Sequence, residues 1–252
     1  KNKQKDYMKY LADIGSYFIM LKQVFSRPTK GSVLKELILK EIDELVIDSL
    51  GIVIFISFFV GGVVAIQTAL NISNPLIPDY LVGFATRQSI ILEFAPTFMS
   101  IIMAGKMGSF ITSSIGSMRV TEQIDALEVM GINPLNYLVF PKIIALLLYP
   151  FVIAISMFLG ILGGWVAGVY GGFSTSDAFI RGLQEDFISF HIVYAFIKTF
   201  AFAFILATVP SWQGFFMKGG ALEVGKASTN SFVWTSVLII LTNYIITSLL
   251  LS

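Results

Sequence analysis

The chain alternates between long apolar runs and shorter polar segments. The five long runs are Leu50–Ile72, Ile90–Met103 with its start near Tyr80, Tyr137–Tyr170, Ile192–Pro210 and Phe232–Leu251. A helix of roughly 20 apolar residues crosses a hydrocarbon core about 30 Å thick. The pattern therefore predicts an all-α integral membrane protein with about five transmembrane helices.

Two of these runs differ from a plain span. Glu93 and Pro96 interrupt the second run. The third run has 34 residues, which is more than one perpendicular crossing needs. We expect it to tilt, to kink near Pro150 or to protrude, and a tight pair of spans is the alternative.

Residues 1–49 are predicted to form amphipathic helices at the cytoplasmic interface rather than a separate globular domain. In Tyr7–Phe25, apolar and aromatic side chains are mixed with lysines, as in a helix that lies in the membrane interface. Residues 34–45 repeat apolar positions at helical spacing, either as a solvated connector or as a binding element. Pro28 marks a break between the two segments. We assign residues 50–252 to the transmembrane domain.

Lysine and arginine residues are distributed unequally between the polar segments. Fourteen of them fall on the side of the N-terminus, and only Arg87 and Arg181 fall on the opposite side. Short cytoplasmic segments of membrane proteins carry an excess of positive residues. The N-terminus is therefore predicted to be cytoplasmic.

The composition excludes several classes of function. Hydrophobic residues make up 56% of the chain and charged residues 13%, about half the charged share that is typical of a soluble domain. The chain has no cysteine, and its single histidine, His191, disfavours a histidine metal site. A net charge of +1 provides no basic field for nucleic acid. We therefore expect no metal, no cofactor and no nucleic-acid partner.

The most informative polar segment is Gly116–Pro134. Four apolar residues recur there at helical spacing, acidic residues fill positions between them, and Gly131 with Pro134 ends the pattern. The segment is either an ordinary interfacial loop helix or a coupling helix that contacts a cytoplasmic ATPase. Acidic side chains suit a protein partner better than an anionic lipid surface. The residues assigned to ATPase coupling are Met118, Arg119, Glu122, Gln123, Asp125 and Glu128.

Three motifs carry a family resemblance. They are Glu93-Phe94-Ala95-Pro96, Ala104-Gly105-Lys106-Met107-Gly108-Ser109 and Met118-Arg119-Val120-Thr121-Glu122-Gln123. Over about residues 50–252 the chain resembles the MlaE (YrbE) permease family. The resemblance implies the permease subunit of an ABC transporter that moves phospholipids between the bacterial inner membrane and an MCE-domain lipid-binding partner, maintaining outer-membrane lipid asymmetry. It also implies a homodimer and a separate ABC ATPase subunit.

A phospholipid path needs an apolar wall for the tails and a few polar groups for the head. The candidates for this lining are Val64 and Gln67 on the first span, Glu93 on the second, and Asn243 and Tyr244 on the fifth. An acid within a span usually faces a protein interior or a water-filled cavity. Glu93 therefore either lines the path or makes a structural hydrogen bond between helices, and no residue is assigned a catalytic role.

A row of glycines in the third run allows close approach of another helix, either within one subunit or at a dimer seam. The row consists of Gly160, Gly164, Gly168 and Gly172.

Two other functions are alternatives, and one further motif resembles a nucleotide-binding site. An ion-coupled secondary transporter would use Glu93 and Lys198 as a titrating pair and would need no ATPase. An intramembrane lipid-modifying enzyme would normally show clustered acids or histidines. Gly220–Ala227 nearly matches a phosphate-binding P-loop, but alanine stands where the Mg²⁺-binding hydroxyl belongs. ATP hydrolysis is therefore expected in a separate chain.

Overall fold

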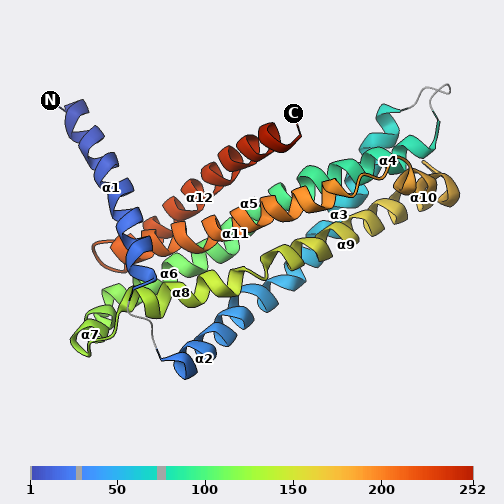
Figure 1. Cartoon of the computed structure of the whole chain (residues 1–252). Coiled ribbons are helices and arrows are strands. Elements are labelled where there is room, and N and C mark those ends of the chain that lie inside the picture. Colours follow the sequence, from blue (N-terminus) through green and yellow to red (C-terminus); the bar gives the residue numbers. More distant parts are fainter. Residues whose placement is uncertain (1, 27–29, 73–77, 252) are drawn as a thin grey trace. The chain divides into compact units, whose positions relative to one another are not determined.

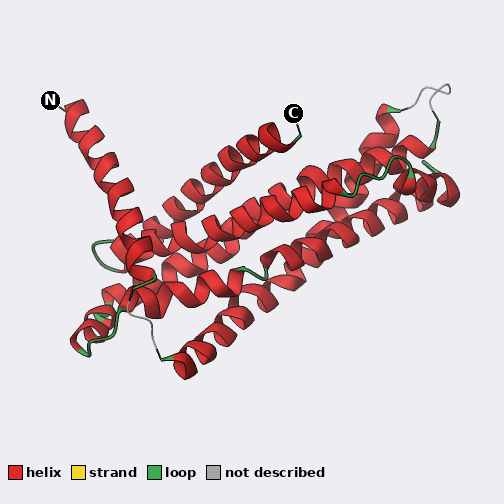
Figure 2. Cartoon of the chain, in the orientation of Figure 1, coloured by secondary structure: helices red, strands yellow, loops and turns green. Residues whose placement is uncertain are grey.

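The computed structural model describes residues 2–26, 30–72 and 78–251, with side chains from residue 13 onward. Within these residues all regular secondary structure is helical (Figure 2). The helical segments long and apolar enough to cross a membrane are Gly31–Asn71, Tyr80–Val120, Pro134–Tyr170, Phe190–Phe216 and Ala221–Leu250. The predicted all-α membrane protein with about five spans is confirmed.

The chain forms two compact units. The first unit comprises the residues up to Leu45 together with Ala104–Leu146 and Phe204–Thr235. The second unit comprises Val46–Met103, Leu147–Ala203 and the residues from Ser236 onward. Each unit therefore combines segments that are far apart in the sequence.

The N-terminal region contains two helices of different character (Figure 1). Helix α1 (Asn2–Val24) is a separate helix, whereas α2 (Gly31–Glu41) continues through the π-helical segment η1 (Ile42–Ile47) into α3 (Asp48–Asn71). The boundary expected between residues 49 and 50 falls inside this continuous helix. The break predicted at Pro28 lies outside the described residues.

The second span contains two π-helical segments between its α-helical parts. It consists of α4 (Tyr80–Ser89), η2 (Ile90–Phe98), α5 (Met99–Met103), η3 (Ala104–Gly108) and α6 (Ser109–Val120). The segments η2 and η3 are π-helical, and π-helical turns are uncommon and often occur at functional sites. Pro96 lies inside η2 and has no N–H to donate, so regular α-helical bonding is interrupted there.

The third span is interrupted near its middle. Helix α8 (Pro134–Leu146) and helix α9 (Tyr149–Tyr170) are separated by Leu147 and Leu148. Pro150 occupies the first turn of α9, where a missing N–H leaves no helical bond unmade. The helix is thus interrupted close to Pro150, where a kink is predicted, and the segment counts as one candidate span. The remaining helices of the second half are α10 (Ser176–Gln184), α11 (Phe190–Phe216) and α12 (Ala221–Leu250).

Helices α3 and α9 pack through glycines in the second unit. A Cβ atom added to Gly61 would overlap the carbonyl group of Gly160, and one added to Gly163 would overlap that of Phe58. A Cβ atom added to Gly164 would lie 2.9 Å from Cγ2 of Thr86. The interpretation in which the glycine row packs within one subunit is therefore confirmed for Gly160 and Gly164.

Arg87 fastens α4 to the end of α10 in the same unit. Its guanidinium is buried and donates hydrogen bonds to the carbonyl oxygens of Leu183 (2.6 Å) and Glu185 (2.9 Å). The C-terminal carbonyls of a helix carry partial negative charge, so they stabilise the cation without a carboxylate contact. This arrangement fixes the start of the second span.

Candidate functional site

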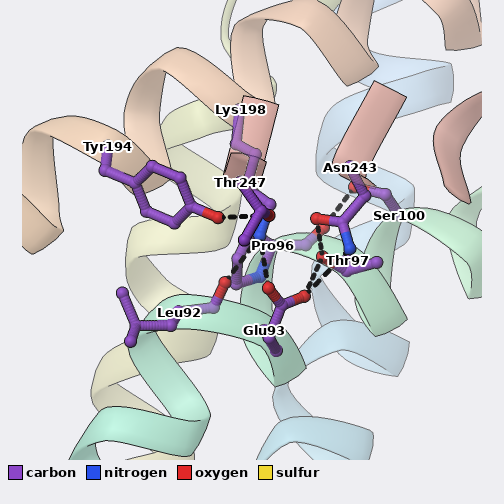
Figure 3. Close-up of polar contacts among 9 residues, drawn as sticks. All are labelled: Leu92, Glu93, Pro96, Thr97, Ser100, Tyr194, Lys198, Asn243 and Thr247. Atoms are coloured by element: carbon purple, nitrogen blue, oxygen red, sulfur yellow. Dashed lines mark hydrogen bonds and ion pairs between the residues drawn. The ribbon is translucent and has the colours of Figure 1, made fainter. Parts of the chain in front are cut away.

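An ion pair between Glu93 and Lys198 lies in the second unit (Figure 3). The Lys198 side chain, on α11, is completely buried, and its Nζ lies 2.9 Å from Oε1 of Glu93. The same ammonium donates a hydrogen bond of 2.8 Å to the carbonyl oxygen of Leu92. The two ionisable residues that the sequence places within separate spans are therefore each other's partners.

Helix α12 joins this ion pair through amide and hydroxyl groups. Nδ2 of Asn243 donates to Oε2 of Glu93 at 3.1 Å. The Thr97 hydroxyl lies within hydrogen-bonding distance of Oε2 of Glu93 (2.9 Å) and Oδ1 of Asn243 (3.0 Å). One turn further along α12, the hydroxyls of Thr247 and Tyr194 are 2.7 Å apart (Figure 3). Three elements, η2, α11 and α12, thus meet at one polar cluster.

The two charges of the cluster have different surroundings. Lys198 has no exposed surface and also lies over the Tyr194 ring, with Nζ 4.7 Å from its centroid. The Glu93 side chain remains 40% exposed in the single chain. A lone ammonium at the centre of a span costs about 2.5–3.5 kcal/mol even on insertion scales. Glu93 offsets this cost, although part of its own side chain stays exposed.

An apolar pocket of about 330 Å³ lies in the second unit between α3, η2, α5 and α9. Val64 and Gln67 line it from α3, and Phe94 and Phe98 line it from η2. The two phenylalanine rings are stacked with centroids 4.9 Å apart. The lining is almost wholly apolar, which suits the hydrocarbon part of a ligand.

The apolar pocket and the polar cluster share the segment η2. Phe94 and Phe98 line the pocket, while their sequence neighbours Glu93 and Thr97 belong to the cluster. Residues that follow one another on a helix point in different directions, so one turn of η2 serves both features. An apolar pocket beside a charged, hydrogen-bonding group can bind an amphiphilic molecule.

The predicted path residues fall in three places. Val64 and Gln67 line the pocket, and Glu93 and Asn243 are hydrogen-bonded to each other in the cluster. Tyr244 is 73% exposed and lies outside both features. Sequence reasoning missed Thr97, although its spacing of four residues from Glu93 on a helix indicates a neighbouring side chain. The roles of all five residues in a lipid path stay predictions.

The polar segment after the second span is not one helix. Helix α6 ends at Val120, Glu122 has a positive φ of 59°, and the seven-residue helix α7 runs from Gln123 to Val129. A single helix over Gly116–Pro134 is therefore wrong, because a left-handed residue cannot continue a right-handed helix. Ile124 is buried in the first unit, whereas Val129 is 89% exposed.

The candidate coupling residues divide into a paired and an exposed group. Arg119 and Asp125 form an ion pair of 2.9 Å across the break between α6 and α7. Glu122, Gln123 and Glu128 are exposed, and Met118 is half-buried. Apart from the paired Asp125, the exposed acidic side chains are thus Glu122 at the N-cap of α7 and Glu128 within α7.

Among the residues that the structure describes, no group of three or more histidine, aspartate or glutamate side chains could hold a metal ion.

The sequence is similar to a known protein family and to several known proteins. The sequence profile of the family described as "Permease MlaE" matches residues 38–249. A probable ABC transporter permease protein of Rickettsia conorii is 30% identical over 246 residues, which are 97% of this chain and 95% of that protein.

Two further relatives are named for more specific roles. The intermembrane phospholipid transport system permease protein MlaE of Haemophilus influenzae is 26% identical, over 85% of this chain and 82% of that protein. The chloroplastic protein trigalactosyldiacylglycerol 1 of Arabidopsis thaliana is 29% identical, over 91% of this chain and 66% of that protein.

Proposed function

The chain belongs to the permease MlaE family, and we propose that it is the membrane-spanning subunit of an ABC transporter that moves phospholipids. The observation that carries this proposal is the family match over residues 38–249, which extends through all five candidate spans. The relative from Haemophilus influenzae, named for intermembrane phospholipid transport, supports phospholipid as the substrate.

The proposed assembly contains two copies of this chain, a separate ABC ATPase and an MCE-domain lipid-binding protein. It lies in the inner membrane of a bacterium, with the N-terminus in the cytoplasm and no catalytic residue in this chain. The excess of lysine and arginine on the side of the N-terminus supports this orientation. The exposed acids Glu122 and Glu128 support α7 as the contact with the ATPase.

The pocket and the polar cluster suggest how a phospholipid is held. Its acyl chains pack against Val64, Phe94 and Phe98, and its polar head faces Glu93 and Gln67. Hydrocarbon buried against apolar side chains is stabilised by about 25 cal/mol per Å². The few polar groups then orient the molecule rather than supply most of the binding free energy.

ATP-driven lipid transfer tests this function. The chain is reconstituted with its ATPase in vesicles containing a fluorescent phospholipid, and transfer to the MCE-domain protein is measured with ATP or a non-hydrolysable analogue. We expect transfer with ATP only. Transfer that follows an imposed proton or sodium gradient without the ATPase would favour an ion-coupled transporter, with Glu93 and Lys198 as its titrating pair. No transfer under either condition would contradict both functions.

A further inference from the structure

The last turn of α1 is held by two asparagines of the chain that follows α7. Nδ2 of Asn133 donates hydrogen bonds to the carbonyl oxygens of Gln23 (2.9 Å) and Ser26 (2.8 Å). Nδ2 of the buried Asn136 donates one of 2.7 Å to the carbonyl oxygen of Val24. Gln23 and Val24 belong to the last turn of α1, where few intrahelical donors remain, and the Gln23 carbonyl also accepts from the N–H (3.0 Å) and the hydroxyl (2.8 Å) of Ser26. We call the three bonds from Asn133 and Asn136 the asparagine link.

Asn133 also starts helix α8. Its Oδ1 accepts from the backbone N–H groups of Leu135 (3.1 Å) and Asn136 (3.4 Å), and Pro134 occupies the first helical position. This is the arrangement of an N-cap followed by proline. One side chain therefore uses its oxygen to fix α8 and its nitrogen to fix α1.

The connection from α7 to Asn133 is short and ordered. Gly131 has a φ of +75°, its N–H bonds to the carbonyl oxygen of Glu128, and the N–H of Ile132 bonds to that of Leu127. These two bonds define a Schellman motif, which ends a helix in a fixed geometry. Two residues later Asn133 begins the next helix, so α7 and α8 are joined without a flexible loop.

Helix α1 has one packed face and one exposed apolar face. On the packed face, Met20 and Val24 are fully buried, and the Tyr17 hydroxyl lies 2.7 Å from that of Thr208. Burial raises the pKa of Tyr17, so its hydroxyl stays neutral at ordinary pH. The remainder of its surface exposes large apolar side chains, including Phe18 and Ile19. Such a helix suits the membrane interface.

We infer that Asn133 is a positioning residue that makes α7 and α1 move together, so that an ATPase docked on α7 acts on the helix at the membrane surface. The inference rests on the proposed function, since it takes the ATPase as the partner of α7. An ordinary N-cap would need only the oxygen of Asn133. The two bonds from its nitrogen to a segment more than 100 residues away are the feature that the inference explains.

Two substitutions separate the roles of this side chain. Asn133→Asp and Asn133→Ser both retain an oxygen that caps α8, because Asp, Asn and Ser are comparable N-caps. The aspartate places an acceptor opposite the carbonyl oxygens of Gln23 and Ser26, and the serine is too short to reach them. Asn133 is only partly buried, so both variants are expected to fold. Gln23→Glu is the charge control, because it adds a carboxylate nearby and keeps the Gln23 carbonyl.

The test uses the full chain with its ATPase in vesicles and has two readouts. One is phospholipid transferred per ATP hydrolysed, and the other is amide hydrogen exchange of residues 20–26. In both Asn133 variants we expect unchanged binding of the ATPase. Amide exchange at the end of α1 should be about tenfold faster, and the lipid transferred per ATP about tenfold lower. A factor of about ten corresponds to the loss of one hydrogen bond of ordinary strength. Gln23→Glu should behave as the unchanged protein.

A crosslink provides the rescue. The side chains of Ser26 and Asn133 approach to 3.4 Å, and the chain contains no cysteine. The double variant Ser26→Cys with Asn133→Cys should transfer little lipid per ATP when reduced and regain it when the two thiols are joined by a short bifunctional reagent. Regained transfer supports the inference, because the N-cap is absent in both states.

Two results would overturn the inference. One is unchanged exchange in the Asn133 variants, and the other is faster exchange with unchanged lipid transfer per ATP. Absence of ATP-driven transfer by the unsubstituted complex would instead overturn the proposed function, while the exchange readout would still report on the asparagine link.

Discussion

At the residue scale, the buried ammonium of Lys198 is paired with the carboxylate of Glu93. The ammonium is fully buried, is bonded to one carboxylate and one backbone carbonyl, and lies over the face of the Tyr194 ring. Asn243 and Thr97 fix the second carboxylate oxygen, so the acid is held in one orientation. A hydrogen-bonded charge pair of this kind is costly to break from one side only, because the remaining charge is left without a partner.

Glu93→Gln alone should therefore destabilise the protein more than Glu93→Gln combined with Lys198→Met. We expect the single variant to lose about 2 kcal/mol, less than the roughly 3–5 kcal/mol seen for fully buried pairs, because the Glu93 side chain is 40% exposed in the single chain. Adding Lys198→Met should restore most of the loss, since no buried charge then remains. Thermal unfolding in detergent measures both. A double variant as unstable as the sum of its single variants would contradict a coupled pair.

The ion pair also shows where sequence reasoning stops. Glu93 and Lys198 are each conspicuous within an apolar run, but 105 positions separate them. No local spacing indicates that two such residues meet, and the sequence left Glu93 open between a lipid path and a structural bond. The contact between Glu93 and Asn243 depends in addition on how α12 packs against η2, and hydropathy does not predict this packing.

At the element scale, close approach of α3 and α9 depends on single glycines. Gly61→Ala would place a methyl group into the backbone of Gly160, and we expect a loss of about 1–3 kcal/mol, the usual cost of overpacking. Gly51, also on α3, has open space around its Cα, so Gly51→Ala should be neutral or stabilising by up to about 1 kcal/mol. Thermal unfolding of both variants checks the contrast. Equal midpoints for the two variants would refute the packing argument.

The acidic face of α7 gives a second prediction at this scale. Glu122→Lys combined with Glu128→Lys should weaken binding of the ATPase by at least about tenfold, because like charges facing each other in an interface are strongly unfavourable. Glu36→Lys combined with Asp43→Lys makes the same change in charge on other exposed positions of the chain and serves as control. Copurification of the ATPase is the measurement. Equal recovery with both double variants would count against α7 as the docking element.

The elements themselves were largely predictable, and their irregularities were not. Runs of apolar residues identify the five spans, because a segment in hydrocarbon has to pair its backbone N–H and C=O groups within its own helix. The interruption near Pro150 follows from a local rule, the preference of proline for the first turn of a helix. The π-helical segments and the left-handed conformation of Glu122 do not follow from such a rule, because apolar periodicity does not distinguish a π-helical turn from an α-helical one and Glu122 is neither glycine nor asparagine.

At the scale of the whole molecule, the orientation in the membrane follows from charge. Asp177 on α10 and Ala221 at the start of α12 are predicted to lie on opposite sides, with Ala221 in the cytoplasm. In this cysteine-free chain, Asp177→Cys should react with an impermeant thiol reagent in intact spheroplasts, and Ala221→Cys only after permeabilisation. Labelling of the Ala221 variant in intact cells would show that the number or direction of the spans is wrong.

The central claim is that a phospholipid occupies the pocket beside the polar cluster, and its direct test is the lipid content of the purified protein. Val64 is buried at the pocket wall, so Val64→Trp should fill the space that the acyl chains need and reduce bound phospholipid severalfold. Ile54→Trp, on the same helix at an exposed position outside the pocket, should carry the full load. Mass spectrometry gives lipid per protein, and native mass shows that each variant keeps its oligomeric state. A full phospholipid load on Val64→Trp would contradict the account.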